Sequence, residues 1–264
     1  MRIRLLPLLL LPLFITAAGC RIAAPHAATM PRDAVTQVAT IDALLAGVYD
    51  GEVTLAELRR YGDTGIGTVN GLDGELLLLD GNFYQIRADG RVYRPDPNEK
   101  TPFAAVTFFQ PQQHYPARPW TEKQLCAQID RWAPDRNLLL AIRITGYFTR
   151  MRTRSVPAQR PPYRPLTAIT EKQPEFELEK VSGTIVGFRL PSYVKGINVP
   201  GYHWHFITAD HRHGGHILNF QIISGRIELQ TLARFYLLLP RHSAGFAAID
   251  LGQDRTEELR RAEQ

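Results

Sequence analysis

The chain has 264 residues, of which 31 are Lys or Arg and 26 are Asp or Glu, so its formal net charge is +5. Residues 1–19 contain Arg2 and Arg4 and no acid, so their removal would lower the charge to +3. This modest charge, without a basic run interleaved with aromatic residues, argues against a nucleic-acid-binding protein. The remaining length is sufficient for one large domain or two smaller ones with substantial cores.

The N-terminus has the pattern of a bacterial export signal. Two arginines precede the apolar run Leu5–Ile15, which is too short to span a membrane. The Ala-Ala-Gly-Cys sequence that follows resembles a lipoprotein cleavage site, with Cys20 as the lipid-bearing residue. We therefore predict a signal peptide over residues 1–19, a tether over residues 20–39, and an exported, extracytoplasmic protein anchored to a membrane. An ordinary cleavable signal, with Cys20 incidental, is the alternative.

The next segments are predicted to be two short helices and a series of strands. The helices are expected over residues 40–46 and 54–61, and Thr54 precedes Glu57 at the spacing of a capping box. From Gly65 the pattern changes to short apolar or alternating runs separated by NGLDG, DGN and ADG. Such runs are typical of strands joined by tight turns.

One longer helix and one long strand follow. The helix is predicted over residues 121–133 and contains Cys126, which we interpret as a packing residue. If Cys20 carries the lipid, no intramolecular disulfide can form, so the fold must depend on its core and any metal. A strand is predicted over residues 138–149 and continues through RMRTRSV. The alternating arginines of that segment lie on one strand face, which suits an anionic small molecule.

A domain boundary is predicted at residues 157–165, where PAQRPPYRP carries four prolines. The later runs are typical of an antiparallel sheet or barrel. We therefore predict an α+β fold that is mostly β, with two β-rich domains and a few helices. The N-terminal domain would cover residues 40–156 with a mixed sheet, and a C-terminal metal-binding domain would cover residues 157–264.

The most informative stretch is GYHWHFITADHRHGGHILNF, over residues 201–220. If it forms a strand, His203 and His205 lie on one face, while Trp204 and Phe206 lie on the other. Two imidazoles on one face can chelate a transition metal, and zinc is the ion most typical of such sites. The alternative is a pair of histidines that lie on the protein surface and bind no metal.

A third ligand could come from the return strand of a hairpin. TADHRHGG has the composition of a hairpin loop, and His216 follows its double glycine. Three histidines would leave a position open for a substrate, as in a catalytic zinc site. The spacing alone does not decide whether the third ligand is His211, His213 or His216.

Longer motifs of this sequence resemble the alpha-acetolactate decarboxylase family, in order from about Ile41 to the C-terminus. They are GDTGIGTVNGLDGELLLLDGNFYQI, TRSVPAQRPPYRPL, QPEFELEKVSGTIVGFRLPSYVKGINVPGYHWHFITAD and GGHILNF. The resemblance implies that the metal ligands are His203, His205 and His216. It also implies two β-rich domains with a few helices and a homodimer.

Four further site residues are implied by the resemblance. Glu75 stands in the LDGE motif, Arg154 in TRSV and Thr68 in GIGT. The family's C-terminal glutamate is assigned to Glu263 in ELRRAEQ, with Glu257 or Glu258 as alternatives.

The implied reaction converts (S)-2-acetolactate to (R)-acetoin and CO2, in acetoin and butanediol biosynthesis. Zn2+ would polarise the substrate ketone, Arg154 would hold the carboxylate, and a carboxylic acid with a raised pKa would protonate the enediolate carbon. One alternative is an extracytoplasmic metal-binding lipoprotein without catalysis. Another is a cupin-type metalloenzyme, which would leave the LDGE and TRSV motifs without roles.

Overall fold

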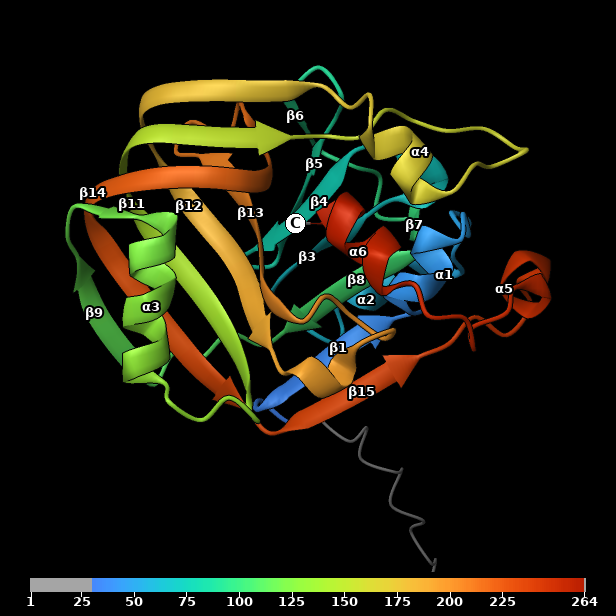
Figure 1. The fold of residues 1–264 in the computed structure, drawn as a ribbon, viewed down its shortest axis with the longest axis horizontal. Coiled ribbons are helices and arrows are strands. Elements are labelled where there is room, and N and C mark those ends of the chain that lie inside the picture. The colour runs from blue at the N-terminus through green and yellow to red at the C-terminus, as the bar shows by residue number, and fades with distance from the viewer. Residues whose placement is uncertain (1–29, 264) are drawn as a thin grey trace, which may run out of the picture.

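The structure is a computed structural model that describes residues 30–263. The predicted signal peptide and Cys20 lie outside the described residues. Two β structures make up most of the molecule, and three short helices gather at one end of it (Figure 1). Within residues 30–263, no helix is both long enough and apolar enough to cross a bilayer.

The elements are as follows. The strands are β1 (Ala34–Val38), β2 (Val53–Thr54), β3 (Thr64–Thr68), β4 (Glu75–Leu79), β5 (Asn82–Ile86), β6 (Val92–Tyr93), β7 (Lys100–Thr101), β8 (Phe103–Thr107), β9 (Gln113–Ala117), β10 (Trp120–Thr121), β11 (Leu139–Arg154), β12 (Glu175–Leu190), β13 (Gly201–Thr208), β14 (Gly214–Leu232) and β15 (Arg234–Leu238). The helices are α1 (Ile41–Leu45), α2 (Leu55–Leu58), α3 (Glu122–Trp132), α4 (Leu166–Thr170), α5 (Ala244–Ala248) and α6 (Thr256–Glu263), with 3-10 turns at Asn70–Leu72 and Ser192–Val194.

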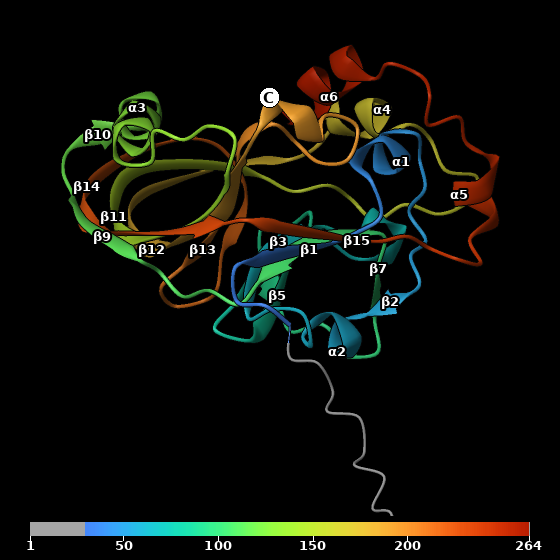
Figure 2. The ribbon, with the colours of Figure 1, turned by 90° about the horizontal axis from the view of Figure 1, so that it is seen from below.

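The first β structure is a seven-stranded mixed sheet in the order β15-β1-β8-β3-β4-β5-β6. Its strands are antiparallel except for the parallel pair β1 and β15. Helix α2 covers one face, as Figure 2 shows, and its Leu55 and Leu58 pack against strand residues such as Leu76 and Val106. The opposite face packs against the second β structure through residues that include Ile66, Val186 and Ile207. The contact between the two sheets is therefore an apolar layer.

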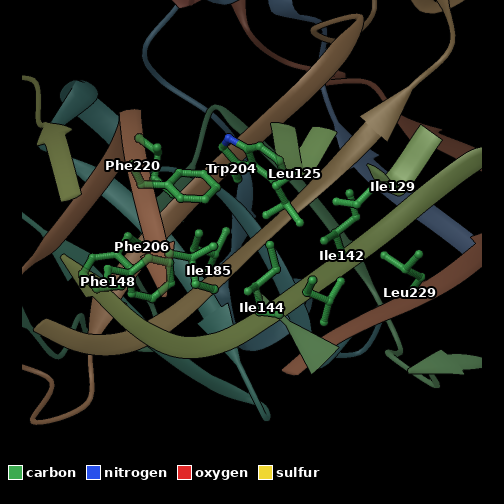
Figure 3. Close-up of a cluster of buried hydrophobic side chains, with 14 of the residues drawn as sticks. Leu125, Ile129, Ile142, Ile144, Phe148, Ile185, Trp204, Phe206, Phe220 and Leu229 are labelled. Carbon is green, nitrogen blue, oxygen red and sulfur yellow. The ribbon is translucent and has the colours of Figure 1, made fainter. Parts of the chain in front are cut away.

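The second β structure is an antiparallel sheet that closes on itself. Its order is β10-β14-β11-β12-β13, and β13 also pairs with β14, so four long strands form a complete ring. Helix α3 lies across this ring, and its N-terminus has the Thr121–Gln124 capping box. Figure 3 shows the apolar cluster inside, which joins Leu125 and Ile129 of α3 to strand residues such as Phe206.

These observations confirm the predicted mostly-β α+β fold, with a mixed sheet and an antiparallel barrel. The predicted helix over residues 121–133 is α3, and the predicted strand from residue 138 is β11. The tether prediction over residues 20–39 requires correction, because Ala34–Val38 form the buried strand β1. AVTQV is short and shows no alternation of apolar and polar residues, since it is covered on both faces.

The predicted boundary between residues 156 and 157 does not separate the two sheets. Strands β9, β10 and β11 precede it but belong to the barrel, whereas β15 follows it and pairs with β1. Pairing between strands distant in sequence is not encoded in local hydrophobic patterns, which explains the difference.

The contact between α3 and the barrel predicts a large effect on stability. Ile129 is fully buried, so Ile129→Ala should lower the free energy of unfolding by about 2–5 kcal/mol. Lys123→Ala, at an exposed position of the same helix, should change it by less than about 0.5 kcal/mol. Urea denaturation measures both values, and similar values for the two variants would mean that α3 does not pack on the barrel.

Candidate active site

Three adjacent strands bring three of the predicted site residues into one row. Arg154 of β11 pairs with His216 of β14, and His216 pairs on its other side with His205 of β13. Directly paired side chains of neighbouring antiparallel strands lie about 4.5–5.5 Å apart at Cβ. His203 lies two residues from His205 along β13 and therefore faces the same way.

The alternation predicted for β13 is observed. Trp204 and Phe206 belong to the apolar cluster inside the barrel. His203 and His205, which are 8% and 1% exposed, line a pocket on the other face of the strand. The aromatic residues therefore fix the strand in the core and direct both imidazoles into the pocket.

The double glycine before His216 allows β14 to fit between its two neighbours. A Cβ atom on Gly215 would lie 2.4 Å from the Arg154 carbonyl oxygen, and one on Gly214 would lie 2.2 Å from the Phe206 carbonyl oxygen. Gly215 also has a φ of +141°, which other residues rarely adopt. Side chains at these two positions would force the strands apart and displace His216.

The three histidines have the arrangement of a metal site. Their candidate ligand nitrogens all lie within 4.8 Å of one another. Nδ1 of His205 lies 2.9 Å from the Leu76 carbonyl oxygen, and a proton on that nitrogen leaves Nε2 free to bind a metal. Among the described residues, the buried Nε2 atoms of His203 and His205 have no hydrogen-bond partner.

Burial also keeps these imidazoles neutral. It lowers the pKa of His205 to about 3, and it holds the pKa values of His203 and His216 well below the usual range. The positive charge of Arg154 acts in the same direction on all three. Neutral imidazoles are the form that binds a metal, so this cluster can hold one and is compatible with zinc.

His211 and His213 lie in the exposed connection between β13 and β14 and are not part of the cluster. The His211 ring packs on Tyr84, with its Nδ1 atom 3.3 Å from the Tyr84 hydroxyl oxygen. Of the three candidates for a third ligand, His216 alone joins His203 and His205.

Glu75 and Thr68 reach the same pocket from the seven-stranded sheet, where they pair directly on β4 and β3. The Glu75 carboxyl oxygen Oε2 lies 3.4 Å from Nε2 of His205. Burial raises the pKa of Glu75 to about 8; Arg154 opposes this shift and Glu263 adds to it. The Thr68 hydroxyl donates to the Gly74 carbonyl at 2.7 Å, which fixes the turn immediately before Glu75.

Glu263 enters the pocket from the last turn of α6. Its Oε2 atom lies 3.4 Å from Nη2 of Arg154, 3.6 Å from Nε2 of His203 and 3.8 Å from Nδ1 of His216. Burial raises the pKa of this carboxyl, and Arg154 opposes the shift. A divalent cation at the histidines would also lower the pKa values of both carboxyls.

The two alternative glutamates of α6 face elsewhere. Glu257 pairs with Arg260, and Glu258 pairs with Arg255, so neither lines the pocket. Leu259 and Ala262 are the buried residues of the helix, and they pack in the cluster shared with α1 and α4. Their burial orients α6 so that Glu263 faces the histidines.

Arg154 differs from the two arginines that precede it on the same strand. Arg150 and Arg152 form partly exposed ion pairs with Glu177 and Glu175 of β12. The prediction that the whole arginine face suits an anionic ligand therefore requires correction, because the acids of β12 already neutralise two of its members. Arg154 alone is buried in the pocket, with 3% of its surface exposed.

All seven predicted site residues line this one pocket. Its remaining wall is apolar, made by Ile41, Leu44, Leu72, Phe103, Val156 and Leu166. A small anionic substrate with short alkyl groups matches such a lining.

Sequence reasoning missed three contributors to this site. They are the Leu76 carbonyl that orients His205, the apolar wall, and the Gln173 side chain, which accepts from Nη1 of Arg154 at 2.7 Å. Helix α6 was also missed, although acids in its first turn and Arg260 and Arg261 in its last turn are signals of a helix. A backbone carbonyl leaves no trace in a sequence pattern, and neither does a contact between distant segments.

Comparisons with known proteins identify the family. The family model for alpha-acetolactate decarboxylase matches residues 35–253. The chain belongs to this family. An alpha-acetolactate decarboxylase from Methylococcus capsulatus is 44% identical over 231 residues, covering 87% of this chain and 88% of the relative. One from Methanosarcina mazei is 43% identical over 241 residues, covering 91% and 83%.

A solved structure agrees with the sequence comparison. The crystal structure of alpha-acetolactate decarboxylase from Bacillus subtilis strain 168 matches with a TM-score of 0.85 and 38% identity, covering 87% of this chain and 99% of the other. Family membership supports acetolactate decarboxylase activity, which is that of a lyase, and confirms the resemblance noted in the sequence. The family model ends at residue 253, so the position of Glu263 rests on the geometry of α6.

The histidine cluster predicts metal binding that depends on three particular residues. His203→Ala, His205→Ala or His216→Ala should each remove most of the bound divalent metal, because two imidazoles hold an ion much less tightly than three. His213→Ala is the matched control, from the exposed loop between the same strands, and should retain the metal. Elemental analysis of purified protein measures this, and loss of metal from His213→Ala would mean a different ligand set.

Proposed function

We propose that this protein is a zinc-dependent acetolactate decarboxylase that converts (S)-2-acetolactate to (R)-acetoin and CO2 in acetoin and butanediol biosynthesis. The observation that carries this proposal is the convergence of three neutral histidines, one buried arginine and two buried carboxyls in one pocket. Each group matches a requirement of the reaction, which releases CO2 from an anionic substrate and adds a proton to the carbon left behind.

His203, His205 and His216 would hold the zinc. Their two partnerless Nε2 atoms and their neutral state support this assignment. Zinc bound by neutral ligands keeps its 2+ charge and supplies a Lewis acid that polarises the substrate ketone.

Arg154 would bind the substrate carboxylate. Its planar guanidinium offers several N–H donors in a geometry that matches a carboxylate. The low exposure of Arg154 strengthens such a contact, since water competes little for either partner. Binding at this point would fix the carboxylate, and therefore the bond that breaks, relative to the histidines.

Glu75 and Glu263 would handle the proton. Loss of CO2 leaves an enediolate. Its carbon must be protonated from one face to give a single enantiomer of acetoin. Burial raises the pKa of Glu75 to about 8 and also raises the pKa of Glu263, and a raised pKa favours the protonated form that can deliver a proton. The two carboxyls reach the histidines from different elements: Glu75 from β4 and Glu263 from α6.

The alternative of a metal-binding lipoprotein without catalysis is not favoured. A protein that transfers metal to a partner requires exposed ligands, whereas these histidines are at most 8% exposed. It would also leave the buried Arg154 and the two carboxyls without a function.

Incubation of the purified protein with racemic 2-acetolactate tests the proposed reaction. We expect the (S) enantiomer to be consumed first and the product, separated by chiral gas chromatography, to be mainly (R)-acetoin. Protein without detectable acetoin formation above the spontaneous rate would contradict the proposal. Formation of racemic acetoin would be consistent with decarboxylase activity, but it would contradict protonation of the enediolate by a carboxyl in a fixed position.

The acid assigned on α6 can be tested against its neighbour. Glu263→Gln should lower kcat about 100-fold or more, because an amide cannot donate a proton as a carboxylic acid does. Glu258→Gln lies on the same helix and pairs with Arg255 outside the pocket, so its kcat should be close to the parent value. The opposite ranking would transfer the role to Glu258.

We also propose that the protein is exported, anchored to a membrane through a lipid on Cys20, and homodimeric. The first two parts rest on the AAGC sequence after the apolar run, and the third rests on the family resemblance. Sedimentation of the protein without its anchor should give twice the chain mass, and a single-chain mass at micromolar concentration would contradict the dimer.

Lipidation predicts incorporation of a labelled fatty acid. Bacteria that express the full chain should label the parent protein and not Cys20→Ser, because Cys20 is the proposed attachment site of the lipid. Cys126→Ser should remain labelled, since that residue lies within α3. A parent protein that is unlabelled and released from the membrane would indicate an ordinary signal peptide.

A further inference from the structure

Arg154 is a buried cation held mainly by neutral oxygen atoms. Nη1 donates to the Gln173 side-chain oxygen at 2.7 Å, and Nη2 donates to the Ala262 carbonyl oxygen at 2.5 Å. Within residues 30–263, the carboxyl that reaches it is that of Glu263, at a longer distance of 3.4 Å. The two shorter contacts orient the guanidinium without neutralising its charge.

The other arginines of the same strand are held differently. Arg150 donates to both carboxylate oxygens of Glu177 at 2.7 and 3.0 Å, and Arg152 pairs with Glu175. Both of these arginines are partly exposed. The two β11 arginines that are partly exposed to solvent therefore pair with carboxylates, whereas the β11 arginine in the pocket pairs with a side-chain amide.

The backbone fixes Gln173 in its position. It lies between α4 and β12, and the register that pairs Arg154 with Glu175 places residue 173 beside the end of β11. The Ser155 amide donates to the Pro174 carbonyl oxygen at 3.3 Å, which continues the contact between β11 and the segment before β12 past the last strand pair. A proline at 174 also restricts the backbone of the residue before it. Gln173 is therefore directed at Arg154 by the fold, and its side chain is half-buried.

We propose that Gln173 is a positioning residue for the substrate: it fixes the Arg154 guanidinium through a neutral oxygen and leaves its charge for the substrate carboxylate. This inference rests on the proposed role of Arg154. Alanine at position 173 would release the guanidinium. Glutamate would keep an acceptor atom at this position but would pair with the guanidinium and compete with the substrate.

The effect should therefore depend on the charge of the ligand. For the parent and for Gln173→Ala, Gln173→Glu and Lys172→Ala, we would measure KM and kcat for acetolactate. Inhibition constants would be measured for 2-hydroxyisobutyrate, which is anionic, and for 2,3-butanediol, which is neutral. Lys172 is the exposed neighbour of Gln173 and serves as the control.

Gln173→Ala should weaken binding of acetolactate and of the anionic inhibitor about five- to tenfold, which is the usual contribution of one hydrogen bond. Gln173→Glu should weaken both by more than Gln173→Ala does, because a charged partner binds the guanidinium more strongly than a neutral one. The diol should bind equally to all four proteins, and their metal content should be unchanged.

Two results would overturn the inference. One is anion binding that does not change in either Gln173 variant, and the other is an equal loss of anion and diol binding, which would indicate a general disturbance of the pocket. Anion binding by Arg154→Lys distinguishes a wrong assignment of Gln173 from a wrong assignment of Arg154. If Arg154→Lys weakens anion binding about 30-fold while the Gln173 variants do not, Gln173 alone is misassigned. If Arg154→Lys has no effect, the carboxylate binds elsewhere and both assignments fail.

Discussion

The active site depends on the insertion of one strand between two others. Strand β14 pairs with β11 on one side and with β13 on the other, and this places Arg154, His216 and His205 in a single row. The space for β14 exists because Gly214 and Gly215 carry no side chain where a Cβ atom would overlap neighbouring carbonyl groups. A shift of one residue in either pairing would turn His216 to the opposite face and leave only two imidazoles together.

The pocket combines groups that are costly to bury when they lack partners. Two imidazole nitrogens have no hydrogen-bond partner among the described residues, and a guanidinium is held mainly by neutral oxygens. An unsatisfied buried polar group costs about 1–3 kcal/mol, and an uncompensated charge costs more. A metal ion at the histidines and an anion at the guanidinium would remove these costs. The apolar packing between the barrel, the mixed sheet and α3 provides the stability that such a site requires.

The sequence predicted those parts of the site that depend on local periodicity. Strand alternation placed His203 and His205 on one face and Trp204 on the other, because a strand period of two needs no tertiary information. The choice of His216, and the presence of Glu75 and Arg154 beside it, came from the family resemblance. Long-range pairing explains the differences: β1 appeared to be tether, and Arg150 and Arg152 appeared equivalent to Arg154 until the acids of β12 were located. Gln173 belongs to the same class, since no local pattern relates it to a residue on another strand.

We propose that the decarboxylase activity of this pocket requires one metal ion held by the three histidines. This requirement is tested most directly by removing the metal with a chelator and returning zinc in measured amounts while the initial rate of acetoin formation is followed. The account predicts a rate that is near the spontaneous value without metal, rises linearly, and reaches its maximum at one zinc per chain. His216→Ala should remain inactive throughout the titration. Full activity of the metal-free protein, or recovery of activity by the His216 variant, would contradict the account.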